Sequence, residues 1–75
     1  MKKRIKTLLE EALPLVNLDS DFLFAELDSL GVMTILMSLS QEFGIELQAS
    51  DATPRNLMNL DSLVALVENK LAAKK

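Results

Sequence analysis

Residues 27–47 read LDSLGVMTILMSLSQEFGIEL, and this stretch decides the fold. Its apolar residues recur about every three to four positions, which is the spacing of one face of an α-helix. Asp28 is a favourable N-cap, and Gly44 is a favourable residue just beyond a helix C-terminus. The sequence therefore predicts a long helix that begins at Asp28 or Ser29 and ends at about Glu42 or Phe43.

This helix has more apolar surface than one side of a small bundle needs. One stripe comprises Val32, Ile35, Leu36, Leu39 and Phe43. A second stripe, on a neighbouring face, comprises Leu30, Met33 and Met37. If the first stripe covers the core, the second exceeds what the core of a small bundle requires. The alternative is that both methionines fill gaps in the core, for which flexible Met side chains are well suited.

The N-terminal part of the chain also has a helical apolar stripe. Pro14 is expected to end or kink that helix near Leu13, because its ring blocks the hydrogen bond to the preceding turn. Residues 17–27 form a predicted connecting loop that is unusually apolar. Phe22 and Phe24 lie in this loop, so we expect it to pack across the bundle and contribute to the core.

The C-terminal part predicts one short helix and one long one. Residues 45–49 are expected to be extended or irregular. Thr53 followed by Pro54 is a strong helix start signal, but Asn59 is the next N-cap, so the helix between them can only be short. The last helix carries an apolar stripe made of Leu60, Leu63, Val64, Val67 and Leu71. The predicted fold is all-α, with three main helices and one short helix in a single domain of residues 1–75.

The residue types that are missing exclude several kinds of chemistry. The chain has 75 residues and contains no His, Cys, Tyr or Trp. Zinc sites and the usual Cys/His or Ser/His/Asp catalytic arrangements therefore lack their parts. No spacing suggests a base for a serine nucleophile, and a chain of this size has little room for a substrate cavity. We therefore expect a protein that is not an enzyme and holds no metal.

The charges are unevenly placed. Between residues 7 and 69, Arg55 is the one basic residue, and the same stretch holds all eleven acidic residues. Such a body repels nucleic acid and attracts basic partner surfaces, although solubility alone also explains it. The basic start leads into an amphipathic pattern rather than an export signal, and no apolar run is long enough to span a bilayer. We expect a cytoplasmic monomer.

The tripeptide Leu-Asp-Ser occurs three times, at residues 18–20, 27–29 and 60–62. Ser20 falls in a cluster of turn-forming residues, where a hydroxyl bonds to nearby backbone. Ser62 falls in the first turn of the last predicted helix, where capping explains it. Ser29 falls at the first position of the long helix. A hydroxyl there lies beside free backbone N–H groups, which favour a phosphate ester, although a plain helix-start serine would look the same.

The wider context of Ser29 resembles the acyl carrier protein family. Leu27-Asp28-Ser29-Leu30 is followed by an apolar helix and then by Gln41-Glu42-Phe43-Gly44-Ile45-Glu46-Leu47, with Ser29 and Phe43 in that family's register. Ser62 has no such sequel. The later segment from Thr53 to Leu71 also looks like the family's third and fourth helices. The resemblance covers nearly the whole chain, and it implies a right-handed four-helix bundle.

The resemblance also implies a function. Ser29 would carry a 4'-phosphopantetheine arm, transferred from coenzyme A by a phosphopantetheinyl transferase with Mg²⁺, and Asp28 would help to place that metal in the transferase complex. The arm ends in a thiol that holds acyl groups as thioesters. Acyl-transferring or acyl-modifying enzymes would be the partners. Leu30, Met33, Met37 and Glu42 match positions that face such partners in the family.

The chain departs from the family's fatty-acid carriers along the long helix. Gly31, Thr34, Ser40 and Gln41 stand where those carriers usually have acidic residues, and Glu42 alone remains acidic. The pattern looks closer to discrete carriers of polyketide, nonribosomal peptide or other specialised acyl pathways. A less charged helix predicts docking that is more hydrophobic and less sensitive to salt. The alternative is a carrier-like interaction module that never receives the arm.

Overall fold

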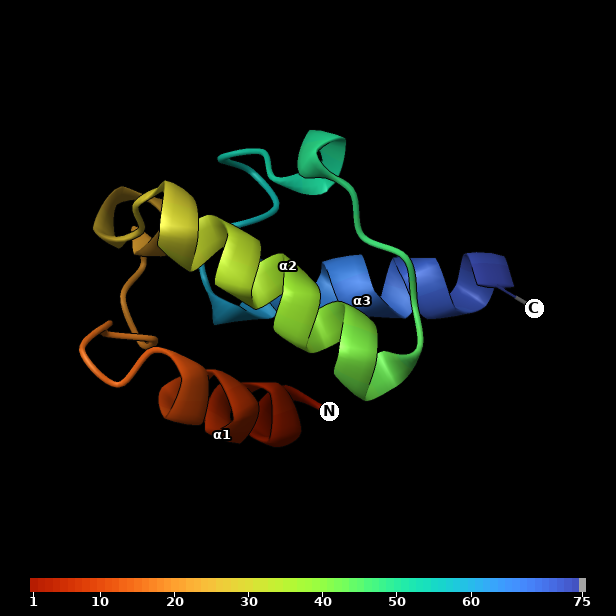
Figure 1. The fold of residues 1–75 in the computed structure, drawn as a ribbon, viewed down its shortest axis with the longest axis horizontal. Coiled ribbons are helices and arrows are strands. Elements are labelled where there is room, and N and C mark those ends of the chain that lie inside the picture. The colour runs from red at the N-terminus through yellow and green to blue at the C-terminus, as the bar shows by residue number, and fades with distance from the viewer. Residues whose placement is uncertain (75) are drawn as a thin grey trace.

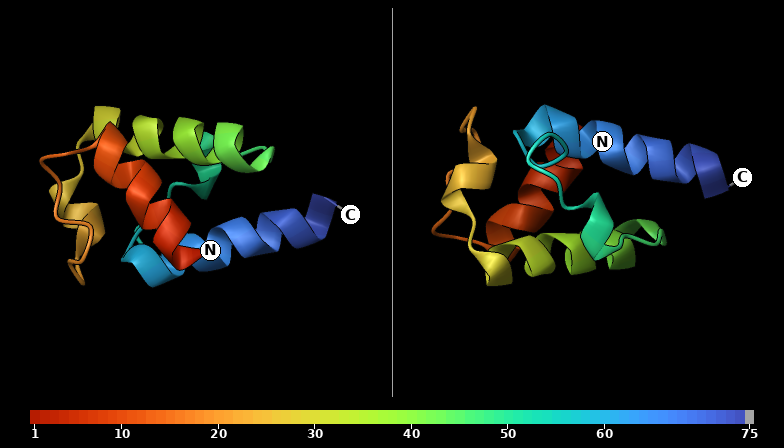
Figure 2. Two further views of the ribbon diagram at one scale, coloured as in Figure 1. Left: turned by 90° about the horizontal axis from the view of Figure 1, so that it is seen from below. Right: turned by 90° about the horizontal axis from the view of Figure 1, so that it is seen from above.

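The structure is a computed structural model that describes residues 1–74, and it is all-α as predicted. The three main helices are α1 (Lys2–Ala12), α2 (Ser29–Phe43) and α3 (Leu60–Lys74). Two short 3-10 helices, η1 (Leu23–Glu26) and η2 (Ala49–Asp51), lie in the connections. Figure 1 shows α2 crossing obliquely in front of α3, with α1 to one side. In Figure 2, α1 bridges α2 and α3, and the C-terminal part of α3 extends beyond the other helices.

The core lies where the apolar faces of the three helices meet. Its fully buried side chains come from all three helices and from both connections, and they are Ile5, Leu9, Leu23, Ile35, Leu39, Leu57, Leu63 and Val67. Each such side chain contributes about 1.5–3 kcal/mol relative to an exposed position. The first apolar stripe of the long helix therefore packs inward as predicted, with Val32 and Phe43 packed partly buried against the core.

The helix ends follow the predicted signals closely. Helix α1 ends at Ala12, and Leu13 is its C-cap, as expected from Pro14. Helix α2 ends at Phe43, and Gly44 adopts the left-handed conformation with φ 62°. That conformation strains residues with a Cβ atom, which explains the glycine.

The loop between α1 and α2 contributes to the core, as predicted. Leu23 is fully buried, and its N–H donates a 2.8 Å hydrogen bond to the carbonyl of Met58. Phe24 packs partly buried against the core. Phe22, however, is 75% exposed, so of the loop's two aromatic residues Phe24 alone packs against the core.

The short helix expected after Pro54 is a single hydrogen-bonded turn. Thr53 behaves as an N-cap, because its Oγ1 accepts the N–H of Asn56 at 3.1 Å and its carbonyl accepts the N–H of Leu57 at 3.0 Å. The turn does not propagate, because Asn59 already caps α3. Helix η2 was not predicted by the sequence pattern and forms around a local hydrogen-bonded box between Gln48 and Asp51.

Asp51 ties η2 to α3 and makes the fold sensitive to acid. Its Oδ2 accepts the N–H of Gln48 at 2.9 Å and lies 3.1 Å from Lys70 Nζ. The hydrogen bond from Gln48 lowers the pKa of Asp51, desolvation opposes this effect, and Lys70 lowers the pKa further. Because the folded-state pKa lies below the unfolded one, the carboxylate stabilises the fold at higher pH, and this contribution is lost as the pH falls through the folded-state pKa.

We therefore expect Asp51→Asn to reduce the acid sensitivity of the protein. Urea unfolding at a series of pH values below about 5 measures this. As the pH falls below 3.8, the ordinary pKa of Asp, the free energy of unfolding should decrease more steeply in the wild type than in Asp51→Asn. Parallel curves in that window would show that Asp51 does not contribute in this way.

Candidate functional site

Ser29 stands at the first position of α2 with an exposed side chain. The preceding Asp28 is extended, with φ −95° and ψ −178°, and its Oδ1 accepts the N–H of Gly31 at 2.7 Å. This is the N-cap predicted from the sequence. The cap fixes where the helix begins, and it therefore fixes where the Ser29 hydroxyl is presented.

Gly31 has a role that the sequence pattern did not reveal. It is buried, and a Cβ atom there would lie 3.2 Å from Asp28 Oδ1 and 3.3 Å from Leu27 Cδ2. Such contacts are tight, so a larger residue would push against the capping carboxylate itself. The only signal in the sequence is a glycine inside a predicted helix, which calls for a packing reason.

The other two Leu-Asp-Ser serines are occupied by local hydrogen bonds. Ser20 Oγ accepts the N–H of Phe22 at 3.0 Å, in the turn before η1. Ser62 Oγ accepts the N–H of Asn59 at 3.0 Å, and as a donor it lies 2.9 Å from the carbonyl of Asn56 and 2.8 Å from that of Asn59. Asn59 Oδ1 in turn accepts the N–H of Ser62 at 2.9 Å.

The Ser29 hydroxyl, by contrast, forms no hydrogen bond with residues 1–74. Within the same part of the chain, the backbone N–H groups of Ser29 and Leu30 have no acceptor either. An exposed hydroxyl beside two unpaired N–H groups, at the positive end of a 15-residue helix, suits a phosphodiester. The residues present therefore fit a phosphate-linked group at Ser29 better than at Ser20 or Ser62.

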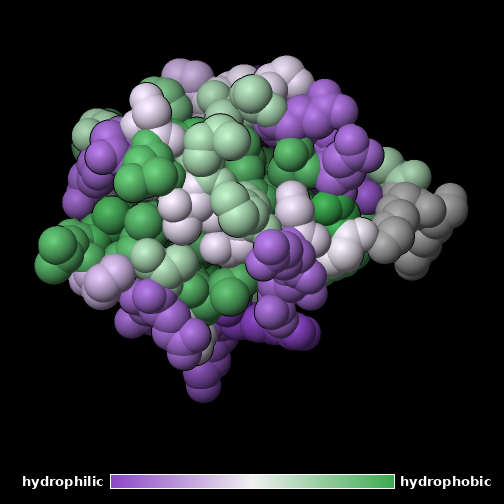
Figure 3. Space-filling view, in the orientation of Figure 1, coloured by the Kyte–Doolittle hydropathy of each residue, from purple (hydrophilic) through white to green (hydrophobic). Residues whose placement is uncertain are grey.

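The second apolar stripe lies on the surface of α2. Leu30 is 75% exposed, Met33 51% and Met37 57%, so neither methionine fills a gap in the core. Figure 3 shows that much of this face is apolar or weakly polar, with strongly hydrophilic residues around it and in the lower middle of the view. We call Leu30, Met33 and Met37 the docking stripe.

Glu42 is separated from the docking stripe and faces α1. Arg4 Nε donates to Glu42 Oε2 at 2.7 Å, and a second guanidinium nitrogen contacts the same oxygen. The Arg4 guanidinium also lies 5.4 Å from the centre of the Phe43 ring. The structure thus places the one acidic residue of α2 in an ion pair that joins the start of α1 to the end of α2.

Two other basic residues of α1 are also paired. Lys2 contacts Asp61 at 2.8 Å, and Lys6 contacts Asp19 at 3.0 Å, an interaction that raises the pKa of Lys6. These exposed pairs contribute little to stability individually, because solvent screens their charges. Together with the Arg4 pair, these contacts link α1 to α3, to α2 and to the loop between α1 and α2.

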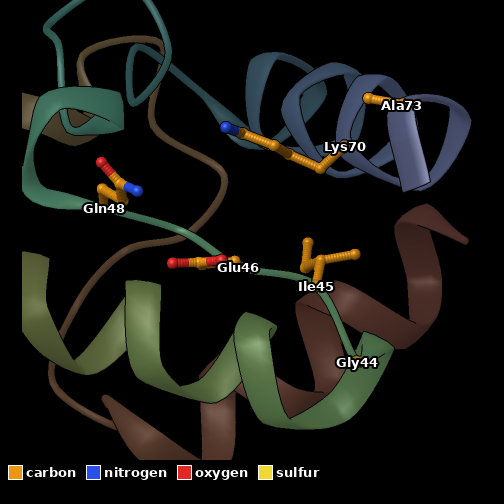
Figure 4. Close-up of a pocket in the computed structure, with 6 residues that line it drawn as sticks. All are labelled: Gly44, Ile45, Glu46, Gln48, Lys70 and Ala73. Carbon is orange, nitrogen blue, oxygen red and sulfur yellow. The ribbon is translucent and has the colours of Figure 1, made fainter.

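Two hollows differ in their relation to Ser29. One, of about 360 Å³, lies between the end of α1 and the start of α2 and is lined in part by Asp28, Leu30 and Leu13. The other, of about 580 Å³, lies between the segment after α2 and the C-terminal half of α3. Figure 4 shows this second hollow, with Lys70 of α3 opposite Glu46 and Gln48. None of the predicted site residues lines it.

The described residues contain no group of His, Cys, Asp and Glu side chains that could hold a metal ion. Within the same range, no helix is long and apolar enough to cross a membrane.

Comparison with known proteins identifies the family. Residues 2–69 match the family model described as a phosphopantetheine attachment site. No curated protein and no solved structure matches the chain. The match covers nearly the whole chain, and it implies a 4'-phosphopantetheine prosthetic group, a phosphopantetheinyl transferase as a partner and a carrier role without catalysis. The chain belongs to the family of phosphopantetheine-attachment carrier domains.

Proposed function

We propose that Ser29 Oγ is the attachment atom of the arm and that the protein carries acyl groups in a specialised biosynthetic pathway. The observation that carries the first part is the contrast among the three serines. Ser20 and Ser62 are held by their own backbone neighbourhoods, and Ser29 is exposed with an unpaired hydroxyl at a helix start. A hydroxyl that must be modified by another protein has to be accessible and free of competing hydrogen bonds.

The bound arm supplies a terminal thiol on which acyl groups are held as thioesters, chemistry that a chain without Cys cannot provide itself. The chain's own residues position this group. Asp28 uses one carboxylate oxygen for the Gly31 N–H and so keeps the helix start in place. The unpaired N–H groups of Ser29 and Leu30 would be available to hold the phosphate of the arm. We also propose that Asp28 supports the metal in the transferase complex.

We propose that partner enzymes dock on the docking stripe. The stripe begins one residue after Ser29 and continues for two turns of α2, so a partner seated on it is close to the attachment point. Its exposure has no explanation in the packing of the fold, and apolar surface of this kind marks an interaction site. Glu42 would contribute at the far end of α2, where Arg4 already neutralises it.

The pathway proposal is supported by the charge of α2. Helix α2 carries no basic residue, and its one acidic residue is paired with Arg4. Docking on such a helix depends on apolar contact more than on charge, unlike docking on the acidic helices of general fatty-acid carriers. We therefore propose partners from polyketide, nonribosomal peptide or related acyl pathways, with fatty-acid synthesis as the alternative.

The direct test of the arm uses the purified protein with coenzyme A, Mg²⁺ and a promiscuous phosphopantetheinyl transferase. The intact mass should increase by one phosphopantetheine. An unchanged mass, under conditions in which the transferase modifies another carrier, would contradict the proposal.

The test of the docking stripe uses Met33→Glu, with Leu15→Glu as its matched control. Both changes replace an exposed apolar residue by a carboxylate, since Leu15 is 98% exposed and lies outside the stripe. We expect Met33→Glu to raise the KM for the carrier in the transferase reaction about tenfold, which is the effect of losing a central interface contact. Leu15→Glu should change the KM much less. Equal effects of the two variants would remove the stripe from the docking surface.

A further inference from the structure

All four methionines of the chain are exposed. Met1 is 48% exposed, Met33 51%, Met37 57% and Met58 45%. This is unusual, because Met belongs to the residue types that are most often buried. The chain also lacks Cys, Trp, Tyr and His, so the four thioethers are its most readily oxidised side chains. Oxidants that reach this protein before the arm is attached therefore react at these exposed sulfur atoms.

Two of the four methionines lie together on the docking stripe. Met33 and Met37 are four residues apart on α2, which places them on the same face of the helix. The other two belong to different elements: Met1 precedes α1, and Met58 lies in the turn before α3, where its carbonyl accepts the N–H of Leu23. An oxidant that modifies all four methionines therefore places two sulfoxides on the docking stripe.

We propose that Met33 and Met37 form an oxidation-sensitive site that controls docking on α2. The proposal rests on the proposed role of the stripe. The oxidant is a peroxide, either hydrogen peroxide or an alkyl hydroperoxide. A sulfur lone pair forms the new S–O bond as the O–O bond breaks. The thioether is oxidised by two electrons to a sulfoxide, and the peroxide is reduced to water or an alcohol.

The position of these residues means that oxidation affects docking and leaves the fold intact. Both side chains are about half exposed, so their sulfoxides remain hydrated in the free protein and no core contact is lost. A partner that covers the stripe must remove water from both sulfoxides. An apolar partner surface offers them no hydrogen bonds in return, so docking is weakened. Reduction of the sulfoxides by methionine sulfoxide reductases restores the apolar surface.

The experiment uses the full chain before arm attachment, treated with hydrogen peroxide and then freed of it. Peptide-resolved mass spectrometry locates each added oxygen, and the transferase reaction gives the KM before and after treatment. The double variant Met33→Leu/Met37→Leu keeps the stripe apolar but removes its sulfur atoms. The matched double variant Met1→Leu/Met58→Leu keeps the stripe methionines and removes the other two.

We expect oxygen on both Met33 and Met37, and a ratio of KM after to KM before treatment of at least about fivefold in the wild type and in Met1→Leu/Met58→Leu. The ratio should stay near one in Met33→Leu/Met37→Leu, and reductase treatment should return the wild type to its starting KM. The thermal midpoint should not fall. An equal rise of KM in both double variants, or resistance of Met33 and Met37 under conditions that oxidise Met58, would overturn the proposal. If the untreated wild type receives no arm, the proposed function fails instead, and the positions of the sulfoxides are still measured.

Discussion

Replacing Ser29 by alanine is expected to abolish addition of the phosphopantetheine arm, while Ser62→Ala and Ser20→Ala remain substrates of the transferase. The Ser29 hydroxyl is exposed at the start of α2, and its loss removes the oxygen proposed as the attachment atom. The side chain makes no hydrogen bond within the described residues, so the substitution should leave the fold unchanged. Intact mass after the transferase reaction distinguishes the variants as an all-or-none result.

The two control serines are expected to behave differently in stability. Ser62 Oγ takes part in the capping interaction with Asn59, so Ser62→Ala should lower the free energy of unfolding by about 0.5–2 kcal/mol. Ser29→Ala should lower it much less. The serine expected to matter most for stability is thus not the serine proposed to carry the arm. Arm addition to Ser29→Ala would contradict this assignment.

Replacing Leu39 by alanine is expected to have the largest effect on stability. Leu39 is fully buried in the face of α2 that meets the core. Deleting such a side chain costs about 2–5 kcal/mol, because apolar burial is lost and a cavity remains. A small domain has a total stability near the low end of about 5–15 kcal/mol, so this loss consumes a large part of it.

Met37→Ala is the matched control, because it removes a similar side chain from the exposed face of the same helix. Its expected effect on the free energy of unfolding is within about 0.5 kcal/mol. Urea unfolding followed by helical circular dichroism measures both variants. Similar losses in the two would mean that the two faces of α2 do not differ as the structure shows.

The fold was largely predictable because its signals are local. Asp28 and Gly44 mark the ends of α2 through capping chemistry that depends on a few neighbouring residues. The same holds for Asn59 at the start of α3. Helical period also separates the two apolar stripes of α2, but it left open whether the methionines of the second stripe fill gaps in the core.

The features that were missed depend on contacts between distant segments. The placement of Leu23 involves the turn that precedes α3, because its N–H donates to the carbonyl of Met58, 35 positions away. The pairing of Glu42 with Arg4 joins residues 38 positions apart, and periodicity carries no information about it. The sequence context already separated Ser29 from Ser20 and Ser62, and the structure adds the hydrogen bonds that hold the other two serines.

Peptide mapping of the protein purified from its native host tests the central claim most directly. Cleavage after glutamate places the three serines in separate peptides, with Ser20 in residues 12–26, Ser29 in 27–42 and Ser62 in 47–68. We predict that the mass of phosphopantetheine, with or without an acyl group, is found on the peptide 27–42 and that fragmentation assigns it to Ser29. An arm on either of the other two peptides, or a fully unmodified protein, would contradict the account.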